Sequence, residues 1–87
     1  MARIKTASGF EADINEQIFD DMEILDLIAD LEDGKVRAYR RLSDKLFRPE
    51  EKARLYDHLR TEDGRVPVSA MQAEMEEIFA QVEKAKK

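Results

Sequence analysis

The sequence contains no cysteine and no tryptophan, and it has only one histidine, two prolines and three glycines. Without cysteine the chain cannot form disulfide bonds, thiolate zinc sites, iron–sulfur clusters or a cysteine nucleophile. No stretch approaches the roughly 18 consecutive apolar residues of a membrane span, and the start of the chain lacks the apolar run of a signal peptide. We therefore expect a cytoplasmic protein that does not interact with membranes.

The length and charge of the chain favour one small, acidic domain. Its 87 residues carry 15 lysines and arginines against 20 aspartates and glutamates, a formal net charge of −5. A chain this short buries only about 60% of its unfolded surface, which leaves room for one thin core but not for a deep cofactor cavity. Small domains without covalent links rely on well-packed helices or on oligomerisation, so a homo-oligomer is one expectation.

The spacing of the apolar residues predicts four helices. We expect them over about residues 20–32, 36–47 and 49–60, and from near Ala70 until the last helix frays over residues 84–87. Gly34 ends the first helix, Pro49 is acceptable at the first position of the third, and Ser69 with Gln72 has the spacing of a capping box. The sequence thus predicts an all-α fold, a small bundle of about four helices in a single domain over residues 1–87, with its helical body over 20–87.

Residues 1–19 are predicted to form a short extended arm. Phe10, Ala12 and Ile14 alternate with Glu11 and Asp13, and this alternation is typical of a half-buried strand. The segment is too short to form a sheet alone. We expect it to lie on the helical body or to join the edge of a partner's sheet.

The sequence shows no catalytic, cofactor-binding or metal-binding signature. His58 has no serine, cysteine or second histidine at a spacing that predicts a triad or a metal site, and a lone histidine on a helix is usually at the surface. The loop around Gly64 has some likeness to a calcium loop, but Leu59 and Ala70 would occupy its first and last ligand positions. We expect a protein that is not an enzyme and needs no cofactor.

Two features of the helices bear on possible partners. The second helix has a basic outer face, which makes a small DNA-binding regulator an alternative, although the net charge of −5 opposes binding to nucleic acid. This face and its C-terminal extension comprise Arg37, Arg40, Arg41, Lys45 and Arg48. The last helix has a stripe of Met71, Met75 and Phe79, which is either core or a surface for a partner's helix, because methionine adapts to many partners.

Six short segments of the chain, taken in their order and spacing, resemble the small tail assembly chaperones of long-tailed, siphovirus-like bacteriophages and prophages. They are residues 9–14 (GFEADI), 20–25 (DDMEIL), 31–34 (LEDG), 56–60 (YDHLR), 62–68 (EDGRVPV) and 76–79 (EEIF). The similarity covers nearly the whole chain, and the segment before the last helix is the most telling. The sequence departs from the family at Met22, where an aromatic residue, often tryptophan, is expected.

The resemblance implies a non-enzymatic protein of the bacterial host cytoplasm that is not part of the mature virion. Such a chaperone binds the tape measure protein, a long helical chain, and assists assembly of the tail tube protein around it. A protein of this kind needs apolar surface to offer and net charge to keep the complex in solution. An oligomerising adaptor protein is a further alternative.

Five apolar residues are the candidates for partner binding, because side chains on an arm or at helix margins can be spared from a thin core. They are Phe10, Met22, Met71, Met75 and Phe79.

Overall fold

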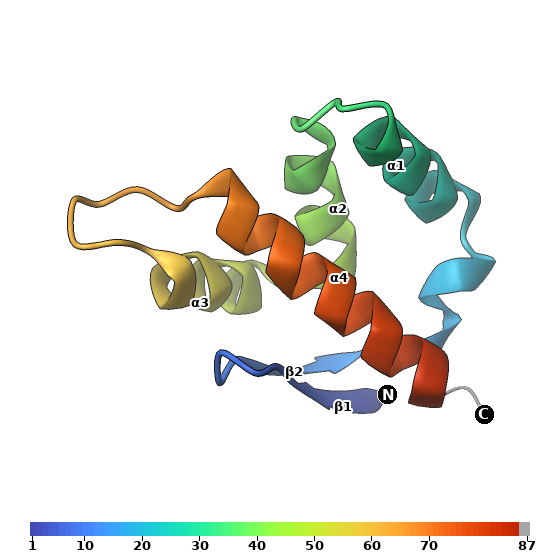
Figure 1. Ribbon diagram of the computed structural model, residues 1–87. Coiled ribbons are helices and arrows are strands. Elements are labelled where there is room, and N and C mark those ends of the chain that lie inside the picture. The colour runs from blue at the N-terminus through green and yellow to red at the C-terminus, as the bar shows by residue number, and fades with distance from the viewer. Residues whose placement is uncertain (86–87) are drawn as a thin grey trace.

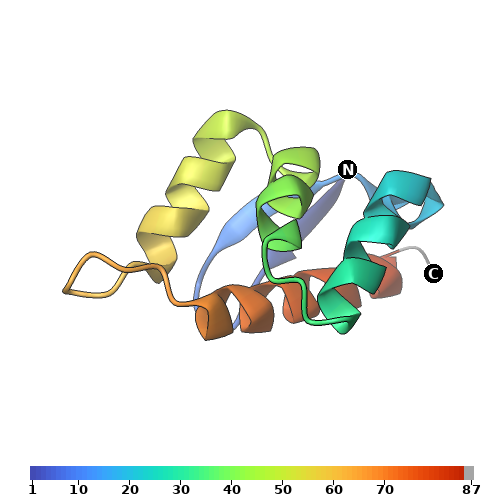
Figure 2. The same ribbon diagram turned by 90° about the horizontal axis from the view of Figure 1, so that it is seen from above.

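The computed structural model describes residues 1–85, and over this range the four expected helices are confirmed (Figure 1). A two-stranded hairpin and a short 3-10 helix precede them. The elements are β1 (Ala2–Lys5), β2 (Glu11–Ile14), η1 (Glu16–Asp20), α1 (Met22–Glu32), α2 (Ala38–Leu46), α3 (Pro49–Leu59) and α4 (Val68–Ala85). Helix α4 crosses the molecule, with the hairpin on one side and α1 and α2 on the other (Figures 1 and 2).

The N-terminal segment is a hairpin within the chain. The predicted alternation of β2 is confirmed, because Phe10, Ala12 and Ile14 are all buried. Strand β1, which the sequence analysis did not identify, pairs with it antiparallel from Ala2 opposite Ile14 to Lys5 opposite Glu11. The segment therefore lies on its own helical body.

The turn of the hairpin depends on a glycine. Gly9 has a φ of 99°, which glycine adopts without strain, and its N–H donates to the Thr6 carbonyl at 2.9 Å. The Thr6 N–H in turn donates to the Phe10 carbonyl at 2.9 Å. These two bonds reverse the chain within a few residues and fix the register of the strands.

Several predicted helix and strand boundaries differ from those of the structure. Residues 16–20 are not extended but form η1, which begins where the Asn15 side chain accepts a hydrogen bond from the Gln17 N–H at 2.9 Å. Helix α4 begins at Val68 rather than Ala70, because the Met71 N–H already bonds to the Pro67 carbonyl at 3.1 Å. Helix α2 begins at Ala38 rather than Val36, and α3 ends at Leu59 rather than Arg60.

Helix α4 supplies much of the core. Its side chains Met71, Met75, Ile78 and Val82 are buried and belong to one apolar cluster together with residues of the hairpin and of α1 to α3. This confirms the core interpretation of the two methionines. The apolar face of the helix is covered because other elements lie on both of its sides.

Polar side chains of α4 and α3 hold both edges of the hairpin. The Gln81 side-chain amide donates to the Lys5 carbonyl at 2.7 Å, and its oxygen accepts from the Lys5 N–H at 3.3 Å. On the other edge, the Arg54 guanidinium donates to the Glu11 carbonyl at 2.8 Å. Each side chain occupies backbone groups with which a third strand would otherwise pair.

Replacement of Gln81 tests this docking of the hairpin. We expect Gln81→Ala to lower the free energy of unfolding by about 1–2 kcal/mol, because two hydrogen bonds to the Lys5 backbone are lost. Gln72→Ala is the matched control on the same helix, since the Gln72 side chain is exposed and, within residues 1–85, bonds only to Glu76. Urea unfolding followed by circular dichroism measures both; equal losses would contradict the proposed role of Gln81.

An ion pair joins the start of α1 to the end of α2. The Asp21 side chain caps α1 by accepting from the Glu23 N–H at 2.9 Å, and Lys45 Nζ lies 3.0 Å from its other oxygen. The hydrogen bond from Lys45 is the main reason that the pKa of Asp21 is lowered below its ordinary 3.8, with backbone N–H groups adding to it. The same pairing, with Glu23 as the larger contributor, raises the pKa of Lys45.

This lowered pKa predicts a pH dependence of stability. A carboxyl whose pKa is depressed on folding stabilises the protein above its unfolded pKa, and this contribution is lost as the pH falls through the folded value. Asp21→Asn keeps a capping side chain but removes the charge, so its unfolding free energy should fall less steeply below about pH 4 than that of the wild type. The control is Asp20→Asn, an exposed neighbour with no ion pair among residues 1–85; if it flattens the curve equally, the assignment to Asp21 is wrong.

Candidate protein-binding groove

An apolar groove lies between α1 and α4, beside the turn that connects α1 to α2. It has a volume of about 420 Å³. Its lining residues are Ile28, Leu31, Glu32, Gly34, Val36, Tyr39, Gln72, Met75, Glu76 and Phe79.

Helical spacing brings the apolar residues of the groove together. Ile28 and Leu31 are three apart on α1, and Met75 and Phe79 are four apart on α4, so each pair shares one side of its helix. Ile28, Leu31 and Phe79 are only partly buried and pack against the edge of the core. The ring centroids of Phe79 and Phe19 lie 5.6 Å apart, and this contact fixes the position of Phe79 at one side of the groove. The floor is therefore apolar and partly open to solvent.

The rim of the groove is acidic. Glu32 and Glu76 are exposed and make no ion pair within residues 1–85, although Glu76 accepts a hydrogen bond from Gln72 at 3.2 Å. Tyr39 lies between the rim and the core. Burial, and to a lesser extent the charge of Glu76, raises the pKa of its hydroxyl. A ligand with an apolar stripe flanked by positive charge complements this surface.

The structure places the five predicted partner-binding residues in different surroundings. Phe79 and Met75 both line the groove, but Met75 is only 1% exposed and forms part of its floor. Met22 is 69% exposed at the first position of α1. Met71 is buried, as is Phe10, whose ring packs edge-on against Phe47 with centroids 6.0 Å apart. Partner binding by these side chains stays a prediction; in this fold, contact with Phe10 or Met71 would require the core to open.

The sequence analysis did not identify Ile28, Leu31 and Tyr39 as groove residues. The sequence feature that could have identified them is the width of the apolar stripe on each helix. The stripe is wider than the surface that the neighbouring elements bury, so its margin stays partly exposed. Ile24 and Leu27 take the buried part of the α1 stripe, which leaves Ile28 and Leu31 at its margin. Leu25 and Val36 are apolar as well, and their side chains are 41% and 52% exposed.

The structure also joins three polar residues that are far apart in the sequence. Ser8 in the hairpin turn donates its hydroxyl to Glu74 Oε1 at 2.5 Å and lies 3.0 Å from His58 Nε2. A serine nucleophile needs a histidine that removes its proton, with a carboxylate behind that histidine. Here the serine stands between the other two, and its one proton is directed at the carboxylate. The contact links the hairpin to α3 and α4 and leaves His58 at the surface, as expected.

Within residues 1–85, no three His, Cys, Asp or Glu side chains are grouped so that they could hold a metal ion. No helix in that range is long and apolar enough to cross a bilayer. Models of known families, curated proteins and solved structures gave no significant match to the chain.

A pair of methionine substitutions distinguishes the core from the surface. We expect Met75→Glu to lower the free energy of unfolding by about 3 kcal/mol or more, because a carboxylate would enter the core. Met22→Glu is the matched control and should change stability by less than about 0.5 kcal/mol, since Met22 is exposed at a helix start that favours negative charge. Thermal and urea unfolding measure both variants; a stable, folded Met75→Glu protein would show that this position is not core.

Proposed function

We propose that the protein is a non-enzymatic tail assembly chaperone that binds amphipathic helical segments of a tape measure protein and assists assembly of the tail tube. The observation that carries this proposal is the apolar groove with its acidic rim between α1 and α4. The resemblance of the sequence to small tail assembly chaperones supports the choice of partner.

The groove suits a helix better than an extended strand. A groove between two helices offers two apolar walls and accepts residues that recur every three or four positions on a partner helix. Leu25, three residues before Ile28, continues the apolar side of α1 beyond the groove and is 41% exposed. Met75 in the floor has a flexible side chain that adapts to different partner residues.

The charge of the protein fits the handling of an aggregation-prone chain. Glu32 and Glu76 on the rim favour partner segments whose apolar stripe is flanked by lysine or arginine. The net charge of −5 disfavours association of the loaded complexes with one another. One small domain thus combines a surface for apolar residues with a charged exterior.

Co-expression tests the proposal. The full chain is produced with a tape measure protein encoded beside it and captured by an affinity tag, and the amount and solubility of the captured partner are measured. We expect Leu25→Glu to weaken capture at least about tenfold, which corresponds to about 1.4 kcal/mol. Glu76→Lys should weaken it as well, because the rim charge is reversed.

Val68→Glu is the matched control, since Val68 is an apolar residue 52% exposed that does not line the groove. It should leave capture unchanged. The proposal is wrong if the wild type captures no tape measure protein, or if Val68→Glu weakens capture as much as Leu25→Glu does. Circular dichroism confirms that each variant is folded.

A further inference from the structure

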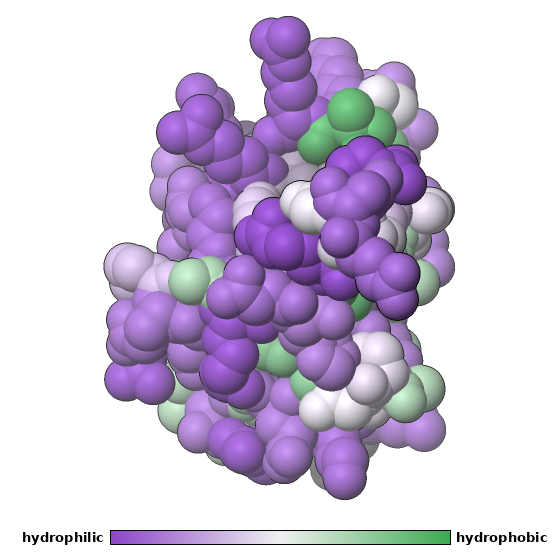
Figure 3. Space-filling view, turned by 90° about the vertical axis from the view of Figure 1, so that its left-hand side faces the viewer, coloured by the Kyte–Doolittle hydropathy of each residue, from purple (hydrophilic) through white to green (hydrophobic). Residues whose placement is uncertain are grey.

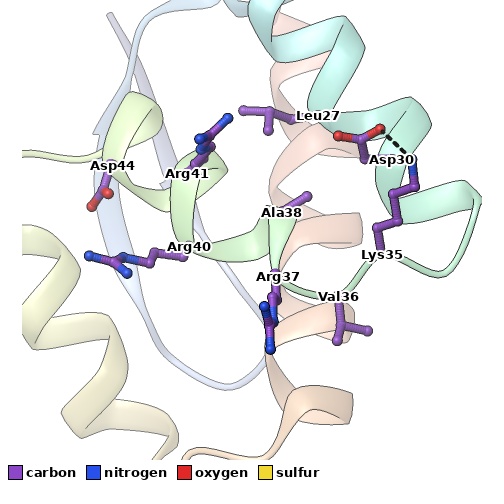
Figure 4. Close-up of a pocket in the computed structure, with 9 residues that line it drawn as sticks. All are labelled: Leu27, Asp30, Lys35, Val36, Arg37, Ala38, Arg40, Arg41 and Asp44. Carbon is purple, nitrogen blue, oxygen red and sulfur yellow. Dashed lines mark ion pairs between the residues drawn. The ribbon is translucent and has the colours of Figure 1, made fainter.

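Three arginines at the start and on the outer face of α2 have guanidinium groups without a bonding partner among residues 1–85. Arg37, Arg40 and Arg41 are exposed, and their guanidinium groups make no ion pair or hydrogen bond in that range (Figure 4). Each of the five other arginines bonds to a carboxylate or a backbone carbonyl. They are Arg3, Arg48, Arg54, Arg60 and Arg65. In a protein with more acidic than basic residues, this concentration of unpaired cations on one helix stands out.

The arginines surround a shallow depression of about 1140 Å³ next to α1. Its apolar part comes from Leu27, Ala38 and the half-exposed Val36, and the arginines fan out around it (Figure 4). Asp30, paired with Lys35 at 3.7 Å, and Asp44 stand at its margin. A ligand here meets an apolar patch at the centre, positive charge around it and carboxylates at the edge.

The basic run on α2 that suggested DNA binding is shorter in the structure than in the sequence, because two of its five residues are paired with carboxylates. Lys45 is held by Asp21 and Glu23, and Arg48 lies against Glu50 and Glu51. Binding of a duplex depends on neutralising many phosphates along its length. Only three free guanidinium groups remain, with carboxylates on either side, and the whole chain carries a charge of −5.

These observations favour carboxylates over a nucleic-acid backbone as the ligand. A guanidinium binds a carboxylate through two parallel hydrogen bonds. Arg37 and Arg41 are separated by about one helical turn, roughly 6 Å along the axis, which matches glutamates or aspartates four apart on a partner helix. The exposed Val36 offers an apolar contact next to them.

We propose that the arginine face of α2, defined as Arg37, Arg40 and Arg41 with Val36, binds an acidic helical segment of a partner protein. This surface shares only Val36 with the groove between α1 and α4, and the proposal does not rest on the proposed chaperone function. It assigns to the protein a second binding surface that is selective for negative charge.

The test uses the full chain and a defined probe. The probe is a fluorescent peptide of about 20 residues built from alanine, leucine and glutamate with the glutamates four apart, and a second peptide carries glutamine at the same positions. Fluorescence anisotropy gives the affinities, and amide chemical shifts in an NMR titration locate the site. We expect the glutamate peptide to bind more tightly than the glutamine peptide and to shift the amides around residues 36–41.

A pair of double variants supplies the matched control. Arg40→Gln/Arg41→Gln should lose at least about tenfold in affinity for the glutamate peptide. Arg60→Gln/Arg65→Gln changes the net charge by the same amount on a loop away from α2, and it should lose less than about twofold. Circular dichroism of both double variants verifies their fold.

Three outcomes would overturn the proposal. The two peptides could bind equally, which would show that the face does not recognise carboxylates. The two double variants could lose affinity equally, which would show that only net charge matters. Finally, a 20-base-pair duplex at the same salt concentration could compete better than the glutamate peptide, which would make this a nucleic-acid surface.

Discussion

The contact between α4 and the hairpin is the constraint on which the rest of the structure depends. The chain has no cysteine and only one thin core, so its stability must come from packing. Helix α4 is the longest helix of residues 1–85, and the hairpin covers it through apolar side chains such as Ile4 and through the bonds of Gln81 to the Lys5 backbone. With the hairpin on that side, the remaining apolar margin of α4 faces α1, and the groove forms there.

The helices could be predicted from the sequence because each depends on local periodicity. The packing of the hairpin on these helices could not, because it depends on residues far apart in the chain. Strand β2 was recognisable from the alternation of Phe10, Ala12 and Ile14. Its partner β1 is equally short, and its pairing depends on contacts made across the Gly9 turn and with α4. For the same reason, periodicity alone could not separate core from interface for Met75. That difference depends on which elements cover its side of α4.

The basic residues of α2 show that the sequence alone does not reveal which charges are paired. The sequence presents five basic residues along α2 and its C-terminal extension as one face, whereas the structure neutralises Lys45 and Arg48 through acidic residues at the starts of α1 and α3. Asp21 caps α1 with one carboxylate oxygen and pairs with Lys45 through the other, so one side chain both caps a helix start and neutralises a surface cation. What remains unpaired is a smaller and more specific group of arginines.

Val36 connects the two proposed surfaces, because it lines both the groove and the depression beside the arginines (Figure 4). Figure 3 shows another side of the molecule that is mostly hydrophilic, with small and separate apolar areas. The rim of the groove, in contrast, is acidic at Glu32 and Glu76, and the face beyond Val36 is basic. An amphipathic helix that followed the groove towards α2 would therefore meet charges of opposite sign along its path. Such a gradient favours one orientation of the helix, with basic residues beside α4 and acidic residues towards α2.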